Sequence, residues 1–166
     1  MNAIVAVDNF WGIGKNNDLL FHIPSDMEFF KKKTLNKIIV MGSNTLLSFP
    51  NSKPLKNRTN IVLFPGGKRD DCIVAQSLDD LKIVLNKFNT QDIFIVGGAM
   101  FYRTMLEYCD SIFVTKVDSN GEATVFFENL DNNINWKLID STETIKADGY
   151  KIKFTEYKNL KLKEFI

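Results

Sequence analysis

Short apolar runs rich in β-branched residues recur along the chain, and segments of helical character separate them. The runs cover residues 3–7 (AIVAV), 37–41 (KIIVM), 60–64 (NIVLF), 92–96 (DIFIV) and 111–117 (SIFVTKV). Runs of this kind are typical of strands that are buried on both faces, as in parallel sheets covered by helices. Their alternation with helical segments therefore predicts an α/β fold with a mostly parallel sheet.

The helical segments begin with recognisable signals. Pro24 lies where the first turn of a helix accepts proline, and this helix is expected to run to about Thr34. Ser77 and Asp80 form a capping pattern for a helix over 78–88. Short helices are also expected after the strands that end near Gly42 and Val96, over SNTLLSF and AMFYRTMLEY.

The remaining segments complete the predicted architecture. A loop with two glycines is expected over 8–18, a loop over 50–58 and a brief strand at 72–75. The FF pair near 126, the WKLID segment and YKIKFTEY predict a closing antiparallel hairpin. With no repeat and no long linker, residues 1–166 are expected to form one domain. It should hold about eight strands in a mixed, mostly parallel sheet, flanked by about four helices.

Charge and composition exclude several classes of function. The net charge is +1, from 21 basic and 20 acidic residues, which gives no electrostatic reason to expect nucleic acid or a membrane surface as a partner. No apolar run approaches the ~20 residues of a membrane span, and the N-terminus lacks the features of a signal peptide. We therefore expect a cytoplasmic protein. His22 is the single histidine and Cys72 and Cys109 lie far apart, so no metal site is expected.

Ligands of open α/β sheets bind beyond the carboxyl ends of the strands, and three glycine-containing stretches begin there. They cover residues 12–17, 42–45 and 97–99. The last two place backbone N–H groups at expected helix starts, where an anion is stabilised. Each signal is weak alone, because many turns between a strand and a helix need glycine for steric reasons. The common dinucleotide and P-loop fingerprints are absent.

Six segments in order resemble dihydrofolate reductases of the bacterial chromosomal type. They read AVDNFWGIG, LLFHIPSDMEFFKKKTLNK, IIVMGSNTLLSF, PLKNRTNIVL, IFIVGGAMFY and VTKVD, and together they span most of the chain. The resemblance implies one domain in which about 38–88 form an adenosine-binding subdomain. It also implies a monomer that reduces 7,8-dihydrofolate with NADPH, by hydride transfer to C6 and protonation at N5.

Asp26 is the residue that the resemblance makes most specific. In the family, the acid on the first helix binds the pterin ring through N3 and the 2-amino group, a bidentate, charge-assisted contact. Phe29 and Phe30 follow at i+3 and i+4, so one helix face can offer a carboxylate beside an apolar wall. Burial there should raise the pKa of Asp26 and suit it to assist protonation of N5. The alternative from the residues alone is an acid that only stabilises the helix N-terminus.

The resemblance assigns further residues to three groups. Besides Asp26, the catalytic group comprises Leu19 and Phe21 in the closing loop 9–23, and Thr115, which would hydrogen-bond to Asp26. Arg58 matches the arginine that binds the α-carboxylate of the glutamate tail of the substrate, although alone it reads equally well as a solvated loop residue. The substrate group comprises Val5, Ala6, Asp26, Phe30, Ser48, Phe49, Leu55, Arg58, Val96 and Thr115. The cofactor group comprises Ala6, Ile13, Gly14, Asn17, Gly42, Ser43, Asn44, Thr45, Leu63, Phe64, Pro65, Ser77, Val96, Gly97, Gly98, Ala99, Met100, Phe101 and Tyr102.

The sequence departs from the family pattern at two places. Phe21 stands where tryptophan is usual, so an indole N–H that helps to hold an active-site water is missing. At the cofactor end, Ser43, Phe64-Pro65 and Met100 replace basic or polar residues that surround the phosphates. Each missing charge-assisted hydrogen bond costs about 1.5–3 kcal/mol. Lys68 and Arg69 follow closely as candidates to replace the lost charge. NADPH is the expected cofactor, with NADH as an alternative.

Two other functions remain open on sequence alone. One is the related NADPH-dependent pyrimidine reductase of riboflavin synthesis, which shares the fold. The other is a catalytically impaired homologue that binds folate or nucleotide, which the altered phosphate contacts suggest. Asp26, Phe30 and Arg58 together favour a pterin with a glutamate tail over both alternatives.

Overall fold

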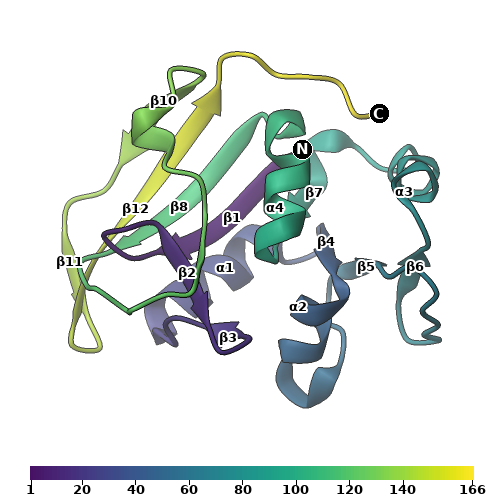
Figure 1. Cartoon of the computed structure of the whole chain (residues 1–166), viewed down its shortest axis with the longest axis horizontal. Helices are drawn as coiled ribbons and strands as arrows, with labels where there is room; N and C mark the ends of the chain where they lie inside the picture. Colours follow the sequence, from purple (N-terminus) through teal and green to yellow (C-terminus); the bar gives the residue numbers. More distant parts are fainter.

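A mixed sheet of nine strands forms the centre of the computed structural model, which describes residues 1–166 (Figure 1). Eight strands follow the order β10-β12-β8-β1-β7-β4-β5-β6, and β11 pairs with β12. The pairings from β8 to β6 are parallel, whereas β12 is antiparallel to β8, β10 and β11. The predicted fold class is confirmed. The strands are β1 Asn2–Val7, β4 Ile38–Gly42, β5 Thr59–Leu63, β6 Ile73–Ala75, β7 Ile93–Ile95, β8 Ser111–Val117, β10 Trp136–Ser141, β11 Ile145–Ala147 and β12 Tyr150–Asn159.

Four α-helices connect or flank these strands, and their starts follow the sequence signals. Pro24 occupies the first turn of α1, and the Ser77 hydroxyl accepts a hydrogen bond from the Asp80 N–H at 3.1 Å to cap α3. The Asp80 carboxylate in turn accepts from the N–H of Gln76 at 3.0 Å. The helices are α1 Pro24–Thr34, α2 Ser43–Ser48, α3 Leu78–Leu85 and α4 Ala99–Met105, with short 3-10 turns η1 Pro50–Ser52, η2 Thr90–Asp92, η3 Leu106–Tyr108 and η4 Leu130–Asn132.

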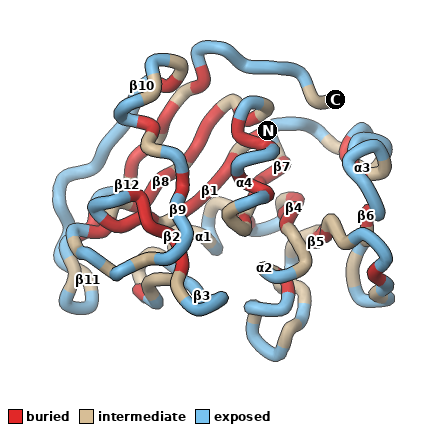
Figure 2. The backbone as a smooth tube through the Cα atoms, viewed as in Figure 1, coloured by how far each residue is buried: buried red, intermediate tan, exposed pale blue.

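Alternation along the strands divides the core into two layers. In β4, Ile38 and Val40 belong to the larger cluster, which contains the buried side chains of α3 and α4. Ile39 and Met41 belong to a second cluster, against which side chains of α1 and α2 pack. In Figure 1, α1 and α4 accordingly lie on opposite sides of the sheet. The central strands are almost fully buried in Figure 2, as expected for strands covered on both faces.

A separate sheet of three strands corrects two predictions. Its order is β3-β2-β9, formed by β2 Gly12–Lys15, β3 Asp18–Leu19 and β9 Val125–Phe126. Residues 8–18 thus contain a hairpin instead of a simple loop, and the FF pair joins β2 instead of the C-terminal hairpin. A Cβ atom on Gly12 would lie 2.4 Å from the Cβ of Ala123, and one on Gly14 would lie 2.8 Å from Val125. These glycines permit close strand pairing, which the sequence pattern alone did not distinguish from a loop.

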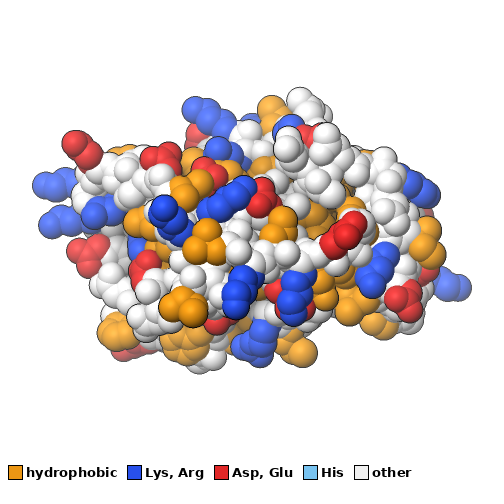
Figure 3. All heavy atoms as spheres, turned by 90° about the horizontal axis from the view of Figure 1, so that it is seen from above, with side chains coloured by type: hydrophobic (Ala, Val, Ile, Leu, Met, Phe, Trp, Pro, Cys, Tyr) orange, Lys and Arg blue, Asp and Glu red, His pale blue; other side chains and the backbone are white.

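The C-terminal tail after β12 packs on the surface. The Phe165 ring lies 5.0 Å from the ring of Tyr108, and Lys163 forms a 2.8 Å ion pair with Glu107. Met1 and Ile166 line the same cavity of about 220 Å³, so the two chain ends are neighbours. None of the helices has the length and apolar character required to cross a membrane. Basic and acidic side chains are interspersed on the face shown in Figure 3.

Candidate active site

Asp26 and Thr115 meet at the face of the sheet that α1 covers. Thr115 lies in β8, opposite Ala6 of β1 in the parallel register. The Thr115 hydroxyl donates a hydrogen bond of 2.6 Å to Oδ1 of Asp26, and no other protein group donates to this carboxylate. Burial raises the pKa of Asp26, while the bond from Thr115 acts in the opposite direction. The second carboxylate oxygen remains available to a ligand.

Four partly exposed apolar side chains pack on the face of the sheet that carries Asp26 and Thr115. Phe30 of α1, Phe49 and Leu55 of the segment after α2, and Val96 after β7 all pack against the second core cluster while staying partly exposed. A flat heterocycle can therefore contact Asp26 with its polar edge and these side chains with its faces. Phe29 instead stacks on Phe154 with ring centroids 4.3 Å apart, so it helps to fix α1 against β12.

Arg58 lies beside the last turn of α1. Its guanidinium donates to the carbonyl of Lys56 at 2.9 Å and to the hydroxyl of Thr34 at 3.4 Å. No carboxylate of the protein lies within ion-pair distance of it, and burial lowers its pKa without neutralising it. Arg58 is thus a partly buried cation that a ligand carboxylate can pair with.

The glycine pair after β7 lies against the start of α2. The Gly97–Gly98 peptide bond is cis, and the N–H of Gly42 donates to the carbonyl of Gly97 at 2.9 Å. A Cβ atom at Gly97 would lie 3.1 Å from the Thr45 hydroxyl, and one at Gly98 would lie 3.3 Å from it. The absence of both Cβ atoms leaves a narrow cradle of backbone and hydroxyl groups, which suits the phosphates of a dinucleotide.

Several residues of the predicted cofactor and substrate groups have side chains on the opposite side of the sheet. Tyr102 is buried against the larger cluster, where its hydroxyl donates to the carbonyl of Ile4 at 2.6 Å, and burial raises its pKa. Val5, Ile13 and Phe101 belong to that cluster as well.

Leu19 and Phe21 of the predicted closing loop lie in different surroundings. Leu19 lies in β3 with 62% of its surface exposed. Phe21 packs edge-on against Tyr150, with ring centroids 5.3 Å apart. Gly14 pairs with Leu19 and with Val125, whereas Asn17 lies at the exposed hairpin turn with a φ of 60°.

The remaining predicted cofactor residues lie mostly at the carboxyl ends of the parallel strands. Met100 of this group is 79% exposed, and Ser48 of the predicted substrate group, at the end of α2, donates to the carbonyl of Thr45 at 2.7 Å. The ring of Phe64 lies over Gly67, where a Cβ atom would clash at 2.0 Å. The others are Gly42, Ser43 and Asn44 after β4, Leu63 and Pro65 at the end of β5, Ser77 after β6, and Ala99 after β7.

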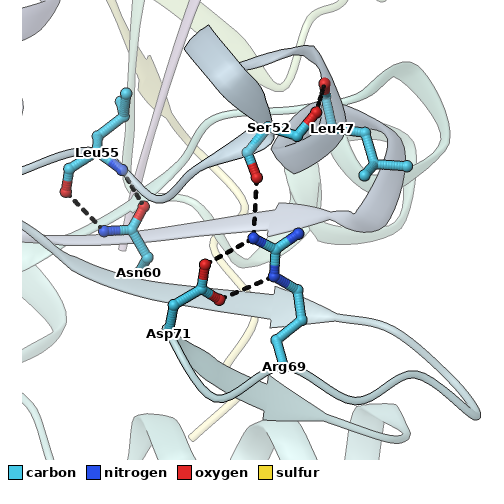
Figure 4. A network of polar contacts seen from close by, with 6 residues as sticks. All are labelled: Leu47, Ser52, Leu55, Asn60, Arg69 and Asp71. Carbon is cyan, nitrogen blue, oxygen red and sulfur yellow. Dashed lines mark hydrogen bonds and ion pairs between the residues drawn. The ribbon is translucent and has the colours of Figure 1, made fainter.

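Arg69, a candidate to replace the missing basic residues, has protein partners in this structure. Its guanidinium makes two hydrogen bonds to the Asp71 carboxylate, of 2.8 and 2.7 Å, and a third of 2.8 Å to the carbonyl of Ser52 (Figure 4). Arg69 is therefore already paired in this structure, and its contact with a cofactor phosphate stays a prediction. Lys68 has no ion-pair partner and borders, with Arg69, a hollow of about 530 Å³ beside β6.

Sequence reasoning missed Asn60, which holds the segment that carries the predicted substrate residues Leu55 and Arg58. Asn60 is buried at the start of β5, and its amide bonds both the N–H and the carbonyl of Leu55, at 3.0 and 2.9 Å. It also donates to the carbonyl of Arg58 at 3.0 Å. A polar residue at the head of a buried apolar run must find partners, and this signal was present in NIVLF.

Comparisons with known proteins indicate the family of the chain. The dihydrofolate reductase family matches residues 1–159. A dihydrofolate reductase of Bacillus subtilis is 35% identical over 150 residues, covering 89% of this chain and 86% of that protein. The type 9 dihydrofolate reductase of Escherichia coli is 30% identical over 164 residues, covering 93% and 90%.

A solved structure extends the agreement to three dimensions. It is the dihydrofolate reductase of Enterococcus faecalis in complex with NADP(H) and RAB-propyl, which is 26% identical and has a TM-score of 0.83. The similarity covers 95% of both chains. With the family match over nearly the whole length, these findings show that the chain belongs to the dihydrofolate reductase family.

Proposed function

We propose that the protein reduces 7,8-dihydrofolate to 5,6,7,8-tetrahydrofolate with NADPH, and that Asp26 assists the proton transfer. The N5=C6 double bond of the substrate gains a hydride at C6 and a proton at N5. The observation that carries this proposal is a partly buried carboxyl group, held by Thr115 at 2.6 Å, on the face of the sheet where partly exposed apolar side chains pack. The unpaired Arg58 lies beside the last turn of the same helix, and these groups would line one substrate groove. Membership of the family supports the reaction itself.

Each part of the groove contributes one task to this reaction. The Asp26 carboxylate accepts hydrogen bonds from the N3 and 2-amino groups of the pterin, which fixes the ring in one orientation. Phe30, Phe49 and Leu55 exclude water from the ring and its linker, and Arg58 pairs with the α-carboxylate of the tail. Because burial raises the pKa of Asp26, its protonated form persists to higher pH and can support protonation at N5.

The glycine cradle and the adjoining subdomain serve the cofactor in this proposal. NADPH supplies the hydride when bound. Gly97, Gly98 and Thr45 would hold its pyrophosphate, and residues 38–88, which contain β4, β5, β6, α2 and α3, would hold its adenosine half. Leu19 and Phe21 would close over the nicotinamide side and exclude water. Phe21 cannot donate a hydrogen bond to water, so water near Asp26 must be held by other groups.

Discrimination between NADPH and NADH should be weak. Ser43 and Phe64-Pro65 offer no cation to a 2′-phosphate, and the Arg69 charge is already paired with Asp71. Lys68 is the one unpaired cation on the loop between β5 and β6. Each charge-assisted contact to the 2′-phosphate contributes about 1.5–3 kcal/mol. The loss of one such contact therefore lowers the preference for NADPH over NADH by roughly a factor of ten or more. We expect kcat/KM for NADPH to exceed that for NADH by less than about tenfold.

The decrease in absorbance at 340 nm with dihydrofolate and either cofactor tests the proposal. Turnover that depends on both substrates, with kcat in the range of about 1–10³ s⁻¹, supports it. Tight binding of folate by folded protein without turnover would instead identify a binding module that has lost catalysis. Arg58→Ala should raise KM for dihydrofolate by about tenfold or more and leave KM for NADPH unchanged.

A further inference from the structure

The segment between α2 and β5 would form one wall of the proposed substrate groove, and it has little regular structure of its own. It carries Phe49, Leu55 and Arg58, and its sole regular element is η1. Asn51 and Ser52 within η1 have φ values of 56° and 52°, in the left-handed region that residues other than glycine seldom occupy. Two successive residues in this conformation persist where surrounding contacts hold them.

Arg69 supplies such a contact from outside the segment. It lies on the loop between β5 and β6, and it donates to the carbonyl of Ser52, the second of the two left-handed residues. The Ser52 hydroxyl in turn donates to the carbonyl of Leu47 at 2.9 Å, near the end of α2. Figure 4 shows this connected series from Asp71 through Arg69 and Ser52 to Leu47.

Asp71 fixes the orientation of the guanidinium. The two carboxylate oxygens of Asp71 accept hydrogen bonds from Nε and Nη2 of Arg69, which fixes the plane of the guanidinium. In this orientation Nη2 also donates to the carbonyl of Ser52. Arg69 keeps 18% of its side chain exposed, compared with 39% for Asp71. Asn60 holds the other end of the segment through Leu55 and Arg58. The wall is therefore anchored at both ends, by one amide and by one ion pair.

We propose that the Arg69–Asp71 ion pair is a positioning unit for the wall that contacts the benzoylglutamate part of the substrate, not a ligand of a cofactor phosphate. This inference rests on the proposed function, since it assigns a role to the wall of that site. When the pair is broken, the turn at Asn51 and Ser52 loses its external hold, and the wall samples other arrangements. Substrate affinity then falls while the reacting atoms at Asp26 keep their geometry.

The two possible roles of Arg69 predict different results for Asp71→Asn and Arg69→Ala. Asp71→Asn weakens the fork and frees Arg69. If Arg69 positions the wall, Asp71→Asn and Arg69→Ala both raise KM for dihydrofolate. If Arg69 were a phosphate ligand in waiting, Asp71→Asn would increase the preference for NADPH over NADH and Arg69→Ala would decrease it.

The experiment compares these two variants with two controls. Asp70→Asn removes the neighbouring carboxylate, which forms no ion pair, and Lys163→Ala removes an exposed pair of similar length far from the loop. Steady-state kinetics are measured with dihydrofolate and with a 6-methyl-7,8-dihydropterin that lacks the benzoylglutamate tail. Dissociation constants for dihydrofolate and hydrogen exchange of residues 47–58 are measured in parallel.

The expected result is selective for the tail. Arg69→Ala and Asp71→Asn should raise KM and Kd for dihydrofolate about fivefold, which corresponds to one lost hydrogen bond, and leave kcat within about twofold. KM for the dihydropterin and the NADPH to NADH ratio should stay unchanged. Exchange of residues 47–58 should become faster, and both controls should behave as the wild type.

Three results would overturn the inference. An unchanged KM for dihydrofolate in both variants, even with faster exchange, would reduce the pair to a local structural contact. An equal rise in KM for both substrates would remove the assignment to the tail. Opposite changes in cofactor preference would make Arg69 a phosphate ligand. If the wild-type protein neither binds nor reduces dihydrofolate, the proposed function is rejected as well. If the wild-type protein is active and the variants behave like it, only the positioning role is rejected.

Discussion

The proposed reaction depends on the protonation state of Asp26. Asp26→Asn keeps the size of the side chain and can still accept the hydrogen bond from Thr115, but it cannot release a proton. We expect kcat at pH 7 to fall by about 10²-fold or more, the usual contribution of a general acid. The deficit should shrink at low pH, where solvent protonates N5. A pH–rate profile checks this, and an equal loss at every pH would contradict the acid role.

The same carboxyl group makes the stability of the protein depend on pH. Burial raises the folded-state pKa of Asp26 above its ordinary value of 3.8, so folding favours the protonated form. Its contribution to stability is present below the ordinary value and is lost as pH rises through the raised one. Asp26→Asn should therefore melt at higher temperature than the wild type at pH 8, and the difference should vanish at pH 3. Glu28→Gln, on the same helix but exposed, should show no such pattern.

Thr115 adjusts the ionisation of Asp26 without touching the reacting atoms. Its hydrogen bond stabilises the charged carboxylate and so lowers the pKa of Asp26 against the effect of burial. Thr115→Val removes the donor at nearly constant volume, and the pKa of Asp26 should rise further. The alkaline limb of the pH–rate profile should move to higher pH, whereas Thr115→Ser should restore it. A profile that Thr115→Val leaves unmoved would refute this coupling.

At the scale of residues, the sequence indicated which side chains belong to the site better than it indicated their hydrogen-bond partners. The resemblance proposed Asp26 and Thr115 as a pair, and the structure brings them to 2.6 Å. It did not predict that Arg69 is held by Asp71 and Ser52, because that arrangement depends on how two loops meet in space. Hydrogen bonds between loops that are distant in the sequence leave no periodic pattern, so the sequence alone does not predict them.

At the scale of elements, Asp8 joins the end of β1 to the loop that precedes β9. Its buried carboxylate accepts from the N–H groups of Phe10 and Gly12 through Oδ1, at 2.9 and 2.8 Å. Oδ2 accepts from the N–H of Gly121 at 3.0 Å. Asp8→Ala leaves three N–H groups without their partner, and we expect the free energy of unfolding to fall by about 2–4 kcal/mol.

Urea denaturation measures this loss, and Asp8→Asn provides the control. The asparagine oxygen can replace Oδ1 and serve Phe10 and Gly12, so the only bond lost should be the one to Gly121. Its destabilisation should accordingly be less than half that of Asp8→Ala. Equal losses for the two variants would show that the charge of Asp8, and not its hydrogen bonds, stabilises the junction.

Elements of the main sheet were predictable because burial on both faces leaves continuous apolar runs. The run SIFVTKV coincides with β8, and KIIVM covers most of β4. The strands of the small sheet were not predictable in this way. β2 consists of GIGK and β9 of two residues, so their pairing rests on close backbone contact at Gly12 and Gly14. Neither periodicity nor β-propensity reports that kind of pairing.

At the scale of the whole molecule, the tail after β12 contributes to stability but lies away from the groove. The Phe165 ring contacts Tyr108, and Lys82 lies 5.2 Å above it. Deletion of residues 162–166 should lower the melting temperature by several degrees, roughly the effect of 1–2 kcal/mol in a domain of this size. kcat and both KM values should stay unchanged. Calorimetry and the 340 nm assay check this, and a changed KM would show that the tail influences the site.

The two layers of the core explain why the general architecture followed from the sequence while the site followed only in part. Odd and even positions of β1 and β4 supply opposite faces, a pattern that any buried strand shows. The same alternation turns Val5 away from Asp26, although Ala6 beside it faces the site through its pairing with Thr115. Placement of a ligand-binding residue thus requires the register, which the apolar run alone does not provide.

The shared cavity at Met1 and Ile166 has a consequence for protein engineering. Because both ends border one space of about 220 Å³, a short glycine-rich linker can join them. New ends can then be opened at the exposed Asp148–Gly149 turn, where both residues have positive φ and only β11 and β12 are connected. We expect the circular permutant to keep the strand pairings of the main sheet and to offer attachment points for a fluorophore at the β11–β12 turn.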